Sequence, residues 1–353
     1  MEKMKIALVA DADSIHISRW FNWLEGQGHI VKIFSLKETS KSLFFGPEPP
    51  LDRTLITNFG SKIRETTKRL QNLIDDFKPD LVHGYFLTNH GFYASRVENY
   101  PTIVQVMGSD LLLHTENSWL LSWIFKHSIK KSSCVISPPL LIEKLKEMGI
   151  KEKDIFSNLI GIDSKIFKPL DKQDVVLFSR GFEEVYNPST VAEAIIKISE
   201  KEPKIKFYLA GEGSLRKEIE IRLVDTNVEF TGQLSEIELA KIMGISKIVI
   251  SPTFSDSIPL TAFEAMSCGS ILIASDIPAH RQWETYGHPI FFFDKEDTEA
   301  LANHILKLCD NQEVLDKALS IGPKLVKNNW DREIISKNIF ERYTKIINDF
   351  HKK

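Results

Sequence analysis

Short apolar runs alternate with amphipathic helical stretches along both halves of the chain, and this alternation constrains the fold more than any other feature. Apolar runs of a few residues between polar segments are typical of strands that are buried on both faces. Helical stretches between such strands predict parallel strands joined by crossover helices. We therefore expect an α/β protein with two doubly wound, Rossmann-like sheets. The expected strands are 5–10, 28–34, 80–83, 102–106 and 133–137 in the first half, and 174–179, 205–210, 228–231, 248–250, 271–274 and 291–293 in the second.

Helices are expected between several of these strands. Ser14 is a plausible N-cap for a helix over 17–27. Val191, Ala194 and Ile198 recur at helical spacing, which predicts one apolar face on a helix over 188–200. The other expected helices are 61–77, 118–130, 298–310 and 331–350.

The alternation breaks at Gly161–Leu170, which has little helical periodicity and contains Pro169. A chain of 353 residues suits two domains, so we expect the link between them here. The predicted domains are 1–165 and 170–330, followed by a final helix within 331–353. Ligands of such sheets bind at the carboxyl ends of the strands, which predicts a ligand cleft between the two domains.

Composition excludes several classes of protein. The net charge of -3 gives no reason to expect a nucleic-acid partner. The three cysteines stand far apart without a CxxC pair, which argues against a disulfide framework or a zinc site and favours a cytoplasmic location. No apolar run approaches the length of a membrane span, and the run 6–10 is too short for a signal peptide.

One segment has two possible interpretations, one of which is contact with a membrane. Residues 118–131 are apolar and aromatic and end in basic residues. A helix packed on the first sheet is the favoured interpretation. The alternative is a peripheral contact with an anionic membrane, at the inner membrane face.

The stretch Ser251–Ser270 is the most informative for chemistry. It reads as a loop that opens a helix near Pro259, and first-turn N–H groups of a helix attract anions. Asp256 lies at the mouth and Glu264 eight positions on, so both side chains can follow one edge. One carboxylate can then accept hydrogen bonds from a sugar and the other from a ribose. The predicted ligand contacts of the helix start are Ser257, Ile258, Pro259, Leu260 and Thr261.

This stretch resembles the signature of the family 4 retaining glycosyltransferases, also described as glycosyl transferases group 1. The family has two Glu separated by seven residues, followed by Ala-Met-x-Cys-Gly; here Glu264 begins the matching Glu-Ala-Met-Ser-Cys-Gly run. The first acid is Asp256, as in a branch that also carries Ser-Asp-Ile-Pro, which matches Ser275–Pro278, and a Trp-Glu pair, which matches Trp283-Glu284.

Weaker motifs in the expected order extend the resemblance over nearly the whole chain. They are Gly28-His29, Gly108-Ser-Asp110, Gly161-Ile-Asp163 with Phe167 and Pro169, Gly211-Glu-Gly213 and Thr231-Gly232.

The resemblance implies a GT-B fold, with an N-terminal acceptor domain, a C-terminal nucleotide-sugar donor domain and a last helix that crosses back to the first domain. It implies that Arg180 binds the donor diphosphate, and that Gly211 and Gly213 lie near the nucleotide. The family carries a Lys where this chain has Tyr186. Either Tyr186 donates a hydrogen bond to the donor in place of that Lys, or another basic group takes over the role of the Lys.

On the acceptor side, many relatives have a His where this chain has Met107. His16 and Asp110 are the acceptor-side candidates. Asp256 and Arg180 are the predicted catalytic residues and Glu264 is the predicted ribose ligand.

The resemblance further implies attack of the acceptor on the face from which the diphosphate departs, with retention of configuration and without metal or other cofactor. We expect transfer of a hexosyl or N-acetylhexosaminyl group, from UDP by family frequency, to a saccharide or lipid-linked acceptor in surface polysaccharide or glycolipid biosynthesis. Asp256, Tyr186 and Met107 leave one alternative open: a sugar-nucleotide-binding protein with impaired catalysis. A nicotinamide oxidoreductase is nearly excluded, because residues 10–14 lack the GxGxxG turn.

Overall fold

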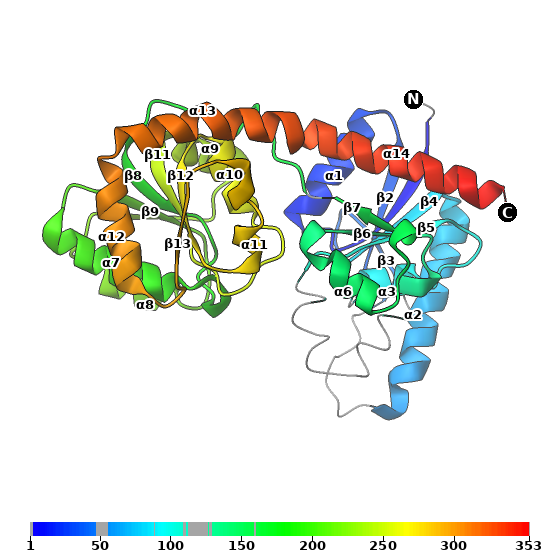
Figure 1. Cartoon of the computed structure of the whole chain (residues 1–353). Helices are drawn as coiled ribbons and strands as arrows, with labels where there is room; N and C mark the ends of the chain where they lie inside the picture. The colour runs from blue at the N-terminus through cyan, green and yellow to red at the C-terminus, as the bar shows by residue number, and fades with distance from the viewer. Residues whose placement is uncertain are drawn as a thin grey trace. The chain divides into compact units, whose positions relative to one another are not determined.

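The computed structural model describes residues 3–46, 56–87, 89–108, 111, 126, 129–158 and 160–352 (Figure 1). The chain divides into two compact units, Met1–Leu159 with Ser336–Lys353, and Ile160–Ile335. Each unit contains one parallel sheet with helices between its strands. The predicted pair of doubly wound sheets is confirmed.

The sheet of the first unit has the strand order β3-β2-β1-β4-β5-β6-β7. Its inner strand β4 is buried at every position, as expected for a strand covered on both faces. The strands are β1 (Lys5–Val9), β2 (Ile30–Ser35), β3 (Leu43–Phe44), β4 (Leu81–Tyr85), β5 (Thr102–Gln105), β6 (Cys134–Ser137) and β7 (Ile155–Ser157). The described helices before the last one are α1 (Ile15–Gly26), α2 (Ile56–Phe77), α3 (His90–Ala94) and α6 (Ile142–Glu147), with short 3-10 turns at Pro139–Leu141 and Glu152–Asp154.

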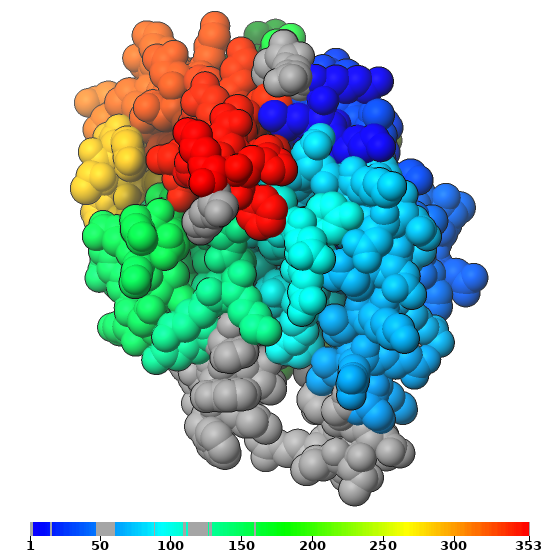
Figure 2. Space-filling model, turned by 90° about the vertical axis from the view of Figure 1, so that its right-hand side faces the viewer, coloured from blue at the N-terminus to red at the C-terminus, as the bar shows by residue number. Residues whose placement is uncertain are grey.

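The last helix, α14 (Arg332–His351), belongs to this unit from Ser336 onward, and a buried polar cluster fixes it there. The Tyr343 hydroxyl accepts a hydrogen bond from Trp20 Nε1 at 3.1 Å and lies 2.5 Å from His83 Nδ1. Burial lowers the pKa of His83 to about 3, so its ring is neutral. Figure 2 shows the C-terminal end of the chain, in red, beside residues near the N-terminus, in dark blue.

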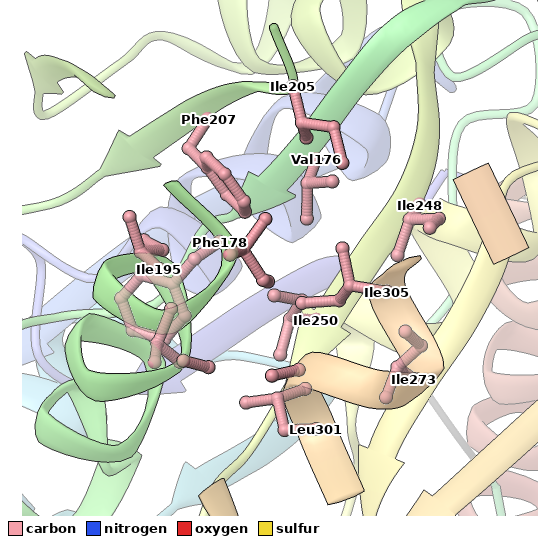
Figure 3. Packing of buried hydrophobic residues seen from close by; sticks show 14 of the residues in the cluster. Val176, Phe178, Ile195, Ile205, Phe207, Ile248, Ile250, Ile273, Leu301 and Ile305 are labelled. Carbon is pink, nitrogen blue, oxygen red and sulfur yellow. The ribbon is translucent and has the colours of Figure 1, made fainter. Parts of the chain in front are cut away.

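The second unit has the strand order β10-β9-β8-β11-β12-β13. Val176, Phe178, Phe207, Ile250 and Ile273 of the sheet pack in one buried cluster with side chains of the covering helices (Figure 3). The strands are β8 (Gln173–Phe178), β9 (Lys206–Ala210), β10 (Val228–Gly232), β11 (Ser246–Ser251), β12 (Ile271–Ser275) and β13 (Ile290–Phe293). The helices are α7 (Pro188–Lys201), α8 (Arg216–Arg222), α9 (Glu236–Ile245), α10 (Leu260–Ser267), α11 (Pro278–Arg281), α12 (Thr298–Cys309) and α13 (Gln312–Asn329), with 3-10 turns at Glu184–Tyr186 and Glu284–Tyr286.

Two segments of the second unit run side by side where the chain enters and leaves it. Ile162 N–H donates to Trp330 O at 2.9 Å, and Arg332 N–H donates to Ile162 O at 2.8 Å. A Cβ on Gly161 would lie 2.5 Å from the Arg332 Cα, so only glycine fits this approach. The guanidinium of Arg332 also pairs with Asp163 and Glu236.

The expected strands are all present, and the structure adds β3 and β7. Ser14 is the N-cap residue of α1, but its side chain makes no capping hydrogen bond there. Most of the predicted helix 118–130 lies outside the described residues and stays a prediction. None of the described helices is long and apolar enough to span a membrane. All three cysteines are buried free thiols.

Candidate active site

The candidate site of the second unit lies where β8 and β11 end. The two strands are parallel neighbours, and the strand order reverses between them, which is where ligands bind in doubly wound sheets. Arg180 follows β8, and the loop 252–259 leads from β11 into α10. Pro259 is the N-cap residue of α10, so the predicted helix start is confirmed.

Arg180 and Asp256 form an ion pair at this edge. Arg180 Nη2 donates to Asp256 Oδ2 at 2.6 Å, and the two side chains are only 16% and 13% exposed. Asp256 Oδ1 accepts the backbone N–H groups of Ser257 at 2.7 Å and Ile258 at 3.2 Å. The Asp256 carboxylate therefore binds two of the amides that the sequence predicts as ligands for an anion.

Tyr186 packs on the same arginine. The Arg180 guanidinium lies 4.6 Å from the centre of the Tyr186 ring, which is a cation–π distance. Arg180 Nε and Ser179 Oγ are buried, and neither atom forms a hydrogen bond with a described residue. Buried donors without a partner are rare in proteins, and each costs about 1–3 kcal/mol.

Glu264 lies inside α10 and is 6% exposed. Its carboxylate is close enough to raise the pKa of the Cys268 thiol, although burial of the thiol is the larger cause. The other predicted ligands around the helix start are Ser257, Ile258, Pro259 and Thr261, which are buried, and Leu260, which is half-buried. The structure therefore places Asp256 before the first turn of α10 and Glu264 in its body.

Gly211 and Gly213 have a packing reason for being glycine. Gly211 follows β9 with φ +137°, and a Cβ there would lie 2.6 Å from Arg180 O. A Cβ on Gly213 would lie 2.5 Å from the backbone of Phe182. The turn after β9 thus packs directly on the segment that carries Arg180. The closeness of the two glycines to a nucleotide stays a prediction.

The acceptor-side candidates belong to the first unit. His16 is half-buried in the first turn of α1, and Asp110 lies outside the described residues. Sequence reasoning missed the ion pair of Asp11 and Lys37, 2.7 Å apart, at the ends of β1 and β2. His90 Nε2 accepts Leu36 N–H at 3.2 Å beside it. Asp11 and Lys37 are single charged residues after two different strands, and nothing in the sequence indicates that they pair.

His280 is a second residue that sequence reasoning missed. It lies in α11, is 1% exposed and contacts residues of β11 and β12 beside the Asp256 loop. A single histidine after a turn has no sequence signature, so only the fold reveals its surroundings. Among the described residues, no group of three or more His, Cys, Asp or Glu side chains could hold a metal ion.

Two family models match the chain. Residues 162–324 match the model described as glycosyl transferases group 1, and residues 5–138 match the model described as glycosyl transferase 4-like. The chain therefore carries two glycosyltransferase-type domains, one in each structural unit.

Solved structures confirm the fold. The chain resembles Anabaena Alr3699/HepE in complex with UDP-glucose, with a TM-score of 0.77 at 14% identity over 97% of this chain and 100% of that one. It resembles the sucrose-phosphate synthase of Thermosynechococcus elongatus, with a TM-score of 0.76 at 16% identity over 98% and 100%. The fold is GT-B.

Two curated relatives are similar to the chain at low sequence identity. An uncharacterized glycosyltransferase, MJ1178 of Methanocaldococcus jannaschii, is 24% identical over 74% of this chain and 75% of its own length. The sulfoquinovosyl transferase SQD2 of Arabidopsis thaliana is 23% identical, over 55% of this chain and 40% of its own length.

Proposed function

We propose that this chain of two glycosyltransferase-type domains transfers a sugar from a nucleoside diphosphate to a saccharide or lipid-linked acceptor. The donor is a UDP-sugar with a hexosyl or N-acetylhexosaminyl group. The product belongs to a surface polysaccharide or glycolipid, made on the cytoplasmic side of the membrane. Peripheral contact with that membrane stays part of the proposal.

The arrangement around α10 carries the proposal. Arg180 follows β8, Asp256 precedes the helix, and Glu264 lies inside it, all within the segment that matches glycosyl transferases group 1. A departing diphosphate gains negative charge as the glycosidic bond breaks, and a fixed guanidinium stabilises that charge most strongly in the transition state. The buried, unpartnered Arg180 Nε is a further donor that a phosphate oxygen would satisfy.

The ligands of similar structures support the choice of donor. Alr3699/HepE is described in complexes with UDP, with UDP and glucose, and with UDP-glucose. TarM of S. aureus, which shares the fold with a TM-score of 0.64 at 15% identity, is described in a complex with UDP and α-GlcNAc-glycerol. A uridine diphosphate bound in the second unit is consistent with both.

In the proposed reaction the acceptor hydroxyl attacks the anomeric carbon on the face that the diphosphate leaves. The acceptor oxygen–carbon bond forms, the carbon–phosphate oxygen bond breaks, and a diphosphate oxygen takes the hydroxyl proton. The configuration is therefore retained. Arg180 supplies the positive charge, so the reaction is proposed to need no metal or cofactor.

A second candidate is a protein that binds nucleotide sugars without turnover. The Asp256 carboxylate favours it, because Arg180 and two backbone amides already bind its oxygens. A carboxylate held in this way is less available to a sugar hydroxyl. Tyr186 favours it as well, since an aromatic ring packs on Arg180 where relatives of this type have a lysine.

One experiment separates the two candidates. The full chain is screened by thermal shift against UDP-glucose, UDP-galactose, UDP-N-acetylglucosamine and GDP-mannose, and each stabilising donor is then tested for hydrolysis and transfer. We expect a UDP-sugar to stabilise the protein and to turn over, with an α-linked product by NMR. Binding without turnover would select the second candidate, and a β-linked product would contradict retention.

A further inference from the structure

His280 lies at the centre of a buried hydrogen-bond network beside the Arg180–Asp256 pair. Its Nδ1 lies 2.9 Å from Ser275 O, and its Nε2 lies 3.0 Å from Ser251 Oγ. A carbonyl oxygen only accepts, so the ring proton is on Nδ1 and Nε2 accepts the Ser251 hydroxyl. Because Ser251 ends β11 and Ser275 ends β12, a neutral His280 ring ties two neighbouring strand ends together.

The network continues from these strand ends into the loop that carries Asp256. Ser275 Oγ donates to Thr253 O at 2.6 Å. Thr253 Oγ1 in turn lies 2.9 Å from Ser255 O and 2.8 Å from Val185 O, and its one proton is shared between them. The chain of bonds thus reaches the residue before Asp256 and the residue before Tyr186.

The whole network is closed to solvent. Ser251, Thr253 and Ser275 are 0% exposed and His280 is 1% exposed. A polar network in such surroundings specifies one arrangement only when every member is satisfied, because each unpaired group carries its full desolvation penalty. Replacing the ring by an apolar side chain would remove the hydrogen bond that the structure gives the Ser251 hydroxyl. It would also leave the Ser275 carbonyl with the Ile277 N–H, at 2.9 Å, in place of two donors.

The charges that face His280 are those of the candidate site. Burial is the main cause that lowers the pKa of His280 to about 4, and Arg180 lowers it further. Asp256 and the bond to the Ser275 carbonyl act in the opposite direction. The ring is therefore neutral near pH 7, in the form that the two hydrogen bonds require.

We propose that His280 is a positioning residue: its neutral ring joins the ends of β11 and β12 and thereby holds the Asp256 loop in place against Arg180. It touches no reacting atom. The effect of His280 on turnover rests on the proposed function, whereas the effect of His280 on the loop does not.

Histidine suits this place because it offers a donor and an acceptor on opposite sides of one rigid ring. Asparagine keeps a donor near the position of Nδ1, and glutamine keeps an acceptor near the position of Nε2. His280→Asn and His280→Gln therefore each retain one of the two bonds, whereas His280→Leu retains neither.

The test is backbone hydrogen exchange of the full chain, measured at the Ser257 and Ile258 amides that Asp256 holds. We expect His280→Leu to speed exchange at both amides about fivefold to tenfold, since one lost hydrogen bond is worth roughly 1 kcal/mol. The Asn and Gln variants should fall between the leucine variant and wild type. The matched control is His304→Gln, since His304 of α12 is half-buried and its one hydrogen bond to a described residue is from Nε2 to Phe292 O.

Two results would overturn the positioning role. One is unchanged exchange at Ser257 and Ile258 in His280→Leu. The other is an equal rise in the exchange rate of core amides, such as that of Phe207, in all three variants. That result would show that His280 stabilises the whole fold and does not position the loop. If the wild type is active, kcat should fall less in His280→Asn and His280→Gln than in His280→Leu. If the wild type transfers no sugar, the proposed function fails while the exchange pattern still decides the role of His280.

Discussion

The guanidinium of Arg180 lies 2.6 Å from the carboxylate of Asp256, and the other oxygen of that carboxylate binds two backbone amides in the loop just before α10. An anion of the protein itself thus occupies a place that the sequence assigns to a ligand anion. A diphosphate that binds here must share Arg180 with Asp256 or displace the carboxylate. Asp256 therefore caps the loop and belongs to the candidate site at the same time.

Removing Arg180 should harm turnover more than donor affinity, because the charge that it meets grows as the bond breaks. Arg180→Ala should also destabilise the fold by on the order of 2 kcal/mol, since it leaves a carboxylate buried without its cation. Urea unfolding and steady-state kinetics measure the two effects. The double variant R180A/D256N should recover stability without recovering turnover. Equal stability of the single and double variants would contradict the role of the pair.

Glycines after β9 should tolerate no side chain. Gly211→Ala and Gly213→Ala would place a Cβ 2.6 Å from Arg180 O and 2.5 Å from the Phe182 backbone, so each should destabilise the protein by about 2 kcal/mol or more. Gly26→Ala in α1 is the control, because nothing lies within 4 Å of its added Cβ. Thermal unfolding compares the three, and a Gly211→Ala variant as stable as Gly26→Ala would be inconsistent with the packing.

Tyr343→Phe should loosen α14 from the first unit. The change removes the hydroxyl that binds Trp20 and His83, and it leaves both of those buried groups short of a partner. We expect a loss of about 1–3 kcal/mol in the free energy of unfolding. Tyr286→Phe removes a hydroxyl from a residue that is 45% exposed and should change stability by less than about 0.5 kcal/mol. Similar losses in the two variants would refute the anchoring role.

The buried histidines should make stability fall as the pH drops from about 6.5 toward 5. Burial lowers the pKa of His90, His280 and His288 to about 4, so the unfolded chain binds protons in this window and the folded chain does not. Stability therefore rises with pH here and is fully present above the unfolded pKa. Urea unfolding at a series of pH values measures the slope, which His280→Gln should reduce. A flat profile between pH 5 and 7 would show that the rings are not held neutral.

The fold could be predicted from the sequence because its signal is local. The expected strands other than β10 contain buried positions, and β11 (Ser246–Ser251) is buried at all but one of its positions. Helix α13 is not among the expected helices, and its Gly322-Pro323 pair is one that would indicate a break. The helix continues through both residues, and Gly322 allows its backbone to lie against Met266 of α10. Tertiary packing outweighs the local signal there.

The candidate site could be predicted only in part. Motif spacing and the family resemblance pointed to Asp256 and Glu264, and the resemblance pointed to Arg180. The ion pair between Arg180 and Asp256 joins residues 76 positions apart, and spacing alone cannot show it. The same holds for His280, whose partner Ser251 is 29 positions away, because such a contact exists only once the strands are adjacent.

The proposed function requires a nucleoside diphosphate to bind the second unit beside α10, with its ribose held by Glu264. Calorimetric titration of UDP into wild type, Glu264→Ala and the isosteric Glu264→Gln tests it most directly, with circular dichroism to verify that each variant is folded. Loss of a charged hydrogen-bond acceptor is worth about 1.5–3 kcal/mol, so both variants should bind UDP roughly 10- to 100-fold more weakly than wild type. Wild-type affinity in a folded Glu264→Ala variant would contradict the claim.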